Sequence, residues 1–174
     1  MAKLAFTKLG LKPNNTVNTI NFNELTIEVK EYLAVNDKLA IISNVINNAI
    51  DNNGYYNEGK IRVYFTLEII DAYTNLSFTD KQKEDECKLY DLLVGNGLWN
   101  KIWNMIPSNE QQYLTECLYE TIKSIYNYKN SVMGILDTVS QDYSNLSLDA
   151  LGIKQDLADP NNLTLLRDVL TKLG

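Results

Sequence analysis

The apolar residues of this chain change their period near residue 34, and this change limits the fold more than any other feature of the sequence. Residues 16–33 read TVNTINFNELTIEVKEYL, with apolar and polar residues alternating on both sides of Asn23-Glu24. A period of two is typical of a strand with one solvent-exposed face. The stretch therefore predicts a β-hairpin with a short loop, bulged or not, at Asn23-Glu24.

From Asn36 onward the apolar residues recur every three or four positions, which is the period of a helix. Asn36 is placed to cap the first helix, and Gly54 is placed to end it. The predicted apolar stripe of this helix consists of Leu39, Ile42, Val45, Ile46 and Ala49.

Residues 60–75 fit two structures, because KIRVYF suits a strand whereas TLEIIDAYTN suits a helix. We expect the strand to give way to the helix near Thr66. Thr79 and Gln82 have the spacing of a capping box, which predicts a helix that continues to Gly95-Asn96-Gly97.

A short apolar helix over 98–106 is expected to end at Pro107, and a much longer helix follows it. Apolar residues step by three or four from Leu114 to Val139, which predicts a helix of about 45 Å, bent at Gly134. A short helix and a final helix beginning at Asp159-Pro160 complete the chain.

The N-terminal segment adds a third candidate strand at residues 4–9, followed by a turn at 12–15. We therefore expect an α+β, mainly α fold: an N-terminal β-hairpin, or three short strands, packed on a helical body with one long helix. At 174 residues the chain is expected to form a single domain over 1–174, with a β-rich segment at 1–33 and the helical body at 34–174.

The net charge of −6 argues against nucleic acid as a partner, because binding to phosphates is driven by Lys and Arg. The lysines of residues 1–15 are the local exception, and we interpret them as a solvated arm. No apolar stretch is long enough for a transmembrane helix, and the N-terminus lacks the apolar block of a signal peptide. We expect a cytoplasmic protein in which Cys87 and Cys117 are free thiols that pack as small apolar side chains.

The sequence lacks the side chains from which reaction centres are usually built. It contains no histidine and only two cysteines, which excludes the common zinc sites and the Ser-His and Cys-His nucleophile pairs. The glycines of GNG at 95–97 indicate a helix end, and the carboxylates near Asp80 indicate a solvated helix start. We therefore expect no enzyme activity, no catalytic residues, no cofactor and no metal.

Binding to other proteins requires only an exposed surface, and two regions are candidates for it. One is the hairpin, and the other is the set of aromatic residues on the later helices; both Trp residues fit a helix core as well as a partner surface. The candidate partner-binding residues are Ile20, Phe22, Ile27, Val29, Trp99, Trp103, Tyr126 and Tyr128. The stripe of the long helix either stays within the monomer or pairs with a second copy in a homo-oligomer.

Five segments together carry a resemblance: FTKLGLK, INFNELTIEVKEYLAVNDKL, TDKQKEDECKLYDLL, NSVMGILDTVSQDYSNLSLDA and LADPNNLTLLRDVLTKLG. They resemble small structural-cassette proteins of tailed bacteriophages of low-GC Gram-positive hosts, whose motifs carry no assigned chemistry. The hairpin followed by helices is also similar to some phage tail assembly chaperones.

The resemblance implies a non-enzymatic protein that binds other phage structural or assembly proteins in the host cytoplasm or in the virion. On this basis the expected role is virion assembly, as a tail assembly chaperone or a head–tail accessory component. The alternative is a phage-encoded inhibitor of a host defence system, such as an anti-CRISPR protein.

Overall fold

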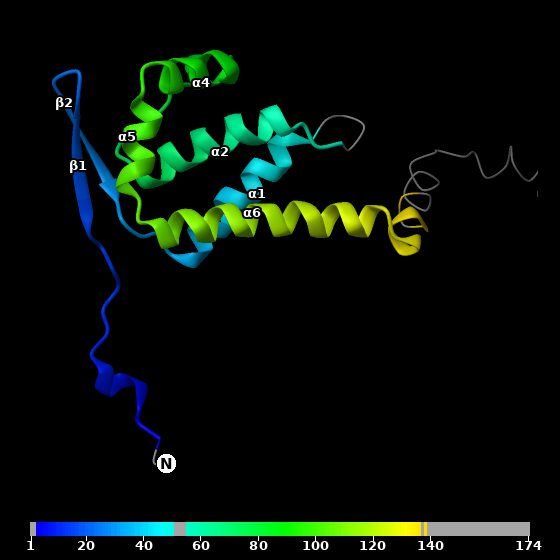
Figure 1. Cartoon of the computed structure of the whole chain (residues 1–174), viewed down its shortest axis with the longest axis horizontal. Coiled ribbons are helices and arrows are strands. Elements are labelled where there is room, and N and C mark those ends of the chain that lie inside the picture. Colours follow the sequence, from blue (N-terminus) through cyan, green and yellow to red (C-terminus); the bar gives the residue numbers. More distant parts are fainter. Residues whose placement is uncertain (1–2, 51–54, 137, 139–174) are drawn as a thin grey trace, which may run out of the picture. The chain divides into compact units, whose positions relative to one another are not determined.

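A two-stranded hairpin packs on a helical body, so the fold is α+β and mainly α, as the sequence predicts (Figure 1). The structure is a computed structural model that describes residues 3–50, 55–136 and 138. The described residues up to Ile122 form one compact unit, and the described residues from Lys123 onward belong to a second unit. The helices are α1 (Val35–Ala49), α2 (Glu58–Tyr73), α3 (Asp80–Lys83), α4 (Glu86–Gly95), α5 (Leu98–Met105) and α6 (Ser108–Lys129).

The predicted hairpin is confirmed. Strand β1 (Val17–Phe22) runs antiparallel to β2 (Leu25–Lys30), in a register that pairs Phe22 with Leu25 and Val17 with Lys30. The loop consists of Asn23 and Glu24 alone, with φ angles of 47° and 65°. Two central residues with positive φ are the mark of a type I′ turn, whose twist matches that of the strands.

The expected strand at residues 4–9 is wrong. Phe6–Leu9 form a single 3-10 turn, η1, which ends at Gly10 with a φ of 62°. No described strand lies beside this segment, so its backbone N–H and C=O groups have no strand to pair with and hydrogen-bond within a local turn instead. The hairpin of the described residues therefore has two strands, not three.

Helix α1 packs on α2 and begins two residues earlier than expected. Its N-cap is Ala34, which has no side-chain bond to offer, so the expected cap at Asn36 is wrong. The helix ends at Ala49, before Gly54, which lies outside the described residues. Most of the predicted stripe is buried, but Leu39 is 48 % exposed because it lies beyond the face turned to α2.

Helix α2 is continuous, so the strand expected before Thr66 is wrong. Asn57 caps it by accepting a hydrogen bond from the Lys60 N–H at 3.1 Å. The helix lies against α1, α4 and α5, and it therefore carries apolar residues on several sides (Figure 1). A helix covered on several sides lacks the single stripe by which helices are recognised in a sequence.

The capping box at Thr79 and Gln82 is confirmed, but the helix it starts, α3, lasts one turn. The chain then begins α4 with a new cap, in which Asp85 accepts a hydrogen bond from the Lys88 N–H. Cys87 in the first turn of α4 is exposed, so the expectation that it packs in the core is wrong; Cys117 is half-buried.

The long helix is shorter than predicted. Helix α6 ends at Lys129, and residues 132–136 are helical again after a break at Asn130-Ser131. The break precedes Gly134, where we expected a bend; a Cβ at Gly134 would overlap the carbonyl of Tyr128, so the turn requires glycine there. The predictions at Val139 and in 140–174 lie outside the described residues.

Candidate interaction surfaces

The chain itself closes the outer edge of β2. The Glu28 N–H donates a hydrogen bond to Asn75 Oδ1 at 3.1 Å, and the Asn75 N–H donates to the Glu28 carbonyl at 3.3 Å. Val29 and Thr74 form an antiparallel bridge beside these bonds. The segment after α2 therefore occupies the place where a further strand would add to β2.

The outer edge of β1 makes no backbone hydrogen bond with any other described segment, although α5 packs near β1. Thr19 lies opposite Glu28, whose backbone groups point out of the hairpin toward Asn75. In an antiparallel ladder both residues of such a pair point away from each other, so the backbone groups of Thr19 point out at the other edge. Val17 and Asn21 share this orientation, and no described residue bonds to the outward backbone groups of these three residues.

One face of the hairpin belongs to the core. Ile27 is 4 % exposed and Val29 is fully buried, so these two candidate partner-binding residues are not on the surface. Ile20 and Phe22 lie on the same face and are half-buried, and the Lys101 ammonium of α5 stands 5.2 Å from the centre of the Phe22 ring. The alternation of apolar residues identified the face of the hairpin that packs on the helical body, but it did not tell a core face from a partner-binding surface.

The two Trp residues form a stack on the half-buried side of α5. The Trp99 and Trp103 rings lie 5.1 Å apart in a stacked arrangement, and Phe65 of α2 meets Trp103 edge-on at 5.8 Å. Leu98 and Ile102 on the neighbouring side of α5 are buried. Helix α5 therefore packs one side into the core, and its two Trp rings form a row of aromatic contacts with Phe65 of α2.

Tyr126 and Tyr128 are exposed by 63 % and 53 %. They belong to the separately described part of the chain that begins at Lys123, so they are not assigned to the same surface as the hairpin or the Trp pair.

The N-terminal arm, residues 3–16, exposes more large apolar side chains than a solvated arm requires. The four are Leu4, Phe6, Leu9 and Leu11, which are 68 %, 73 %, 53 % and 70 % exposed. The arm also carries three lysines and no acidic residue. The exposure of these apolar residues was not foreseen from the sequence, because Leu4, Phe6 and Leu9 fall within the strand expected at residues 4–9.

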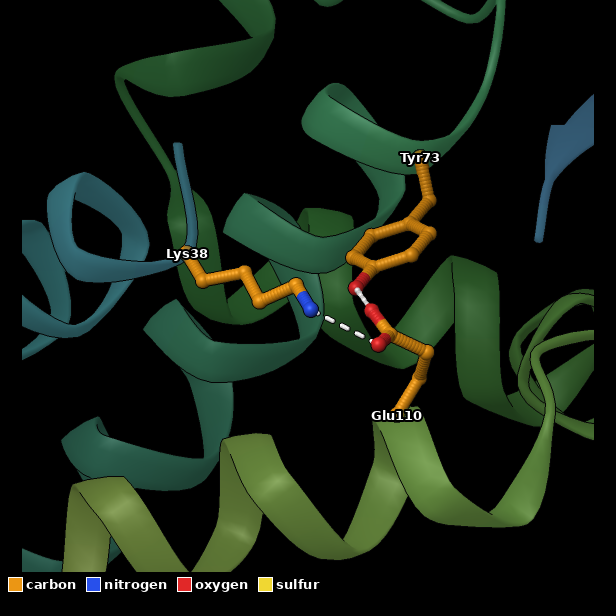
Figure 2. A network of polar contacts seen from close by, with 3 residues as sticks. All are labelled: Lys38, Tyr73 and Glu110. Carbon is orange, nitrogen blue, oxygen red and sulfur yellow. Dashed lines mark hydrogen bonds and ion pairs between the residues drawn. The ribbon is translucent and has the colours of Figure 1, made fainter. Parts of the chain in front are cut away.

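A charged cluster lies buried between α1, α2 and α6 (Figure 2). The Lys38 ammonium stands 2.7 Å from Glu110 Oε1, and the Tyr73 hydroxyl donates a hydrogen bond to Glu110 Oε2 at 2.9 Å. Lys38 also lies over the rings of Tyr32 and Tyr113, at 4.0 and 4.9 Å from their centres. All three members of the cluster are at most 4 % exposed.

Each polar group of this cluster has a partner among the described residues, as is typical of a cluster that stabilises the fold by linking its helices. Burial, together with the hydrogen bond to Glu110, raises the pKa of Tyr73 and keeps its hydroxyl in the neutral, donating form. The side chain of Glu110 is only 5 % exposed. The cluster was not foreseen from the sequence, although Lys38 stands four residues before Ile42 on the apolar stripe of α1, which is an unusual place for a lysine.

A second tyrosine–carboxylate pair lies at a hollow lined by residues of α1, α2, α3 and α4. The Tyr64 hydroxyl donates a hydrogen bond to Glu86 Oε2 at 2.6 Å, and burial together with Glu86 raises the pKa of Tyr64 to about 12. Glu68 and Asp71 line the same hollow. Within the described ranges, no three His, Cys, Asp or Glu side chains are grouped so as to hold a metal ion.

None of the helices in 3–50 and 55–136 has the length and apolar content needed to span a bilayer. No protein-family model, curated protein or solved structure matches the chain.

Proposed function

We propose that this chain is a non-enzymatic protein of a tailed bacteriophage that binds other phage proteins during virion assembly, as a tail assembly chaperone or a head–tail accessory component. The resemblance of five sequence segments to small phage proteins supports the phage origin. The exposed apolar residues of the N-terminal arm support a binding role, and this observation carries the proposal.

The arm has the chemistry of a docking segment. Phe6 and Leu9 are three residues apart on the η1 turn, a spacing that puts both side chains on one side of a helical turn. Exposed apolar side chains of this size cost solvation free energy unless a partner covers them. Lys8 lies between them, so the matching partner surface is an apolar groove with acidic residues at its rim.

The experiment is coexpression of the tagged full chain with the tail tube protein and with the tape-measure protein of the phage that encodes it. Copurification of a stoichiometric complex with either protein is the expected result. Leu9→Asp should abolish copurification. Leu92→Asp is the matched control, because Leu92 is 56 % exposed on α4, away from the arm, and it should leave the complex intact.

Two results would count against the proposal. If neither phage protein copurifies while a host nuclease does so stoichiometrically, the role is inhibition of host defence instead. If Leu9→Asp and Leu92→Asp weaken the complex equally, the arm is not the docking segment.

A further inference from the structure

We propose that the open edge of β1 pairs with β1 of a second copy of this chain, which joins two hairpins into one four-stranded antiparallel sheet. This inference concerns self-association and does not depend on the proposed role in virion assembly. It rests on three properties of β1: its free backbone groups, its lack of charge and its symmetry about Thr19.

The first property is the asymmetry of the two hairpin edges. The edge of β2 is held by Asn75 through two hydrogen bonds, whereas the outward backbone groups of Val17, Thr19 and Asn21 have no partner among the described residues. An isolated two-stranded sheet is marginally stable, and a row of unpaired N–H and C=O groups is a template for another strand.

The second property is that β1 lacks the features that usually block edge pairing. Proteins protect open edges with charged residues, prolines or bulges. The strand VNTINF contains no charge and no proline, and its register with β2 is regular throughout. Residues 13–23 carry no charged side chain at all, whereas β2 carries Glu28 and Lys30.

The absence of charge favours a second copy as the occupant of this edge. The chain as a whole has a net charge of −6, so two copies repel each other over most of their surfaces. At β1 this repulsion is weakest, because every residue that would meet across the new interface is uncharged. A charged partner strand would gain no opposite charge from this edge.

The third property is geometric. The three outward residues, Val17, Thr19 and Asn21, are spaced evenly about Thr19, so a twofold axis at Thr19 pairs Thr19 with its copy and Val17 with Asn21 of the other chain. This register forms about six new backbone hydrogen bonds. It also keeps Ile20 and Phe22 of both chains on one face of the joined sheet, on the side of the helical bodies.

The test is the oligomeric state of the full chain, measured by sedimentation velocity over a range of concentrations. The wild type should form dimers. Thr19→Pro removes an N–H that points out of the hairpin, so it deletes two hydrogen bonds at the axis and should weaken the dimer at least about tenfold. Thr26→Pro is the matched control: Thr26 is also exposed and also points its N–H outward, but on β2, and this variant should dimerise like the wild type.

A charge exchange tests the position of the axis. Thr19→Lys and Thr19→Glu should each be monomeric, because the axis places like charges opposite each other. An equimolar mixture of the two should dimerise. Circular dichroism spectra equal to that of the wild type establish that each variant is folded.

A monomeric wild type at every concentration would overturn the inference. Equal effects of Thr19→Pro and Thr26→Pro, or a mixture of the two charged variants that stays monomeric, would also overturn it. Because the coexpression experiment uses the arm and not β1, failure of either proposal leaves the other testable.

Discussion

The buried contact between Lys38 and Glu110 makes a strong prediction about stability. Lys38→Met keeps most of the side-chain volume and removes the positive charge, which leaves the Glu110 carboxylate buried with the Tyr73 hydroxyl as its one remaining partner among the described residues. Removing one member of a buried ion pair costs about 3–5 kcal/mol, because the other charge stays uncompensated. For a chain of 174 residues this corresponds to a fall in Tm of about 6–20 °C.

Stepwise replacement of the cluster should restore that loss. Lys38→Met with Glu110→Leu removes both charges and leaves the buried Tyr73 hydroxyl without an acceptor, at a cost of about 1–3 kcal/mol. Adding Tyr73→Phe removes that hydroxyl, and the triple variant should return to within about 1 kcal/mol of the wild type or exceed it. The order of stability is therefore single, then double, then triple variant.

Urea denaturation followed by circular dichroism measures this order, with the slope m checked for constancy across the variants. If Lys38→Met alone prevents folding, the double and triple variants still test the prediction, because both should fold. A single variant within about 1 kcal/mol of the wild type would refute the reasoning. A triple variant no more stable than the single variant would refute it as well.

Other features of the fold make predictions of smaller size. Glu24→Gly should raise the free energy of unfolding by about 0.5–1 kcal/mol in the same assay, because glycine adopts the positive φ of this turn position without strain. Trp103→Leu should lower the free energy of unfolding by about 0.5–1.5 kcal/mol more than Trp99→Leu. The Trp103 ring contacts the rings of both Trp99 and Phe65, whereas the Trp99 ring contacts only that of Trp103 among the described aromatic residues. Since the pKa of Tyr64 is raised to about 12, the folded chain keeps a proton that the unfolded chain loses near pH 10. The free energy of unfolding should therefore fall between these two pH values, and Tyr64→Phe should make that fall less steep in denaturation curves recorded over this range.

The hairpin could be predicted from the sequence because the residues that specify it lie close together in the chain. Alternation in residues 16–30 specifies which face of each strand is apolar, and Asn23 is a residue that tolerates positive φ at the turn. The helix start at Thr79 was predictable for the same reason, since a capping box involves residues only three positions apart.

Features that depend on distant residues were not predictable in this way. Ile61, Val63 and Phe65 alternate like a strand, yet they belong to α2 because helices cover several of its sides. The buried cluster joins residues 38, 73 and 110, and no local pattern relates them. The edge of β2 is closed by Asn75, far along the chain, so the open edge at β1 could be recognised only from the structure.

The two hydrogen bonds between Glu28 and Asn75 also limit the size of any assembly that forms by adding strands to the hairpin. A hairpin open at both edges can take up chains on either side without end, and this is how fibrils elongate. Here the edge of β2 is already paired with the segment after α2 of the same chain, so the hairpin can accept one further strand, at the edge of β1. Asn75→Ala would remove the bond that Asn75 Oδ1 accepts but keep the backbone bond to the Glu28 carbonyl and the bridge between Val29 and Thr74, so it should weaken this block on strand addition at β2 without abolishing it.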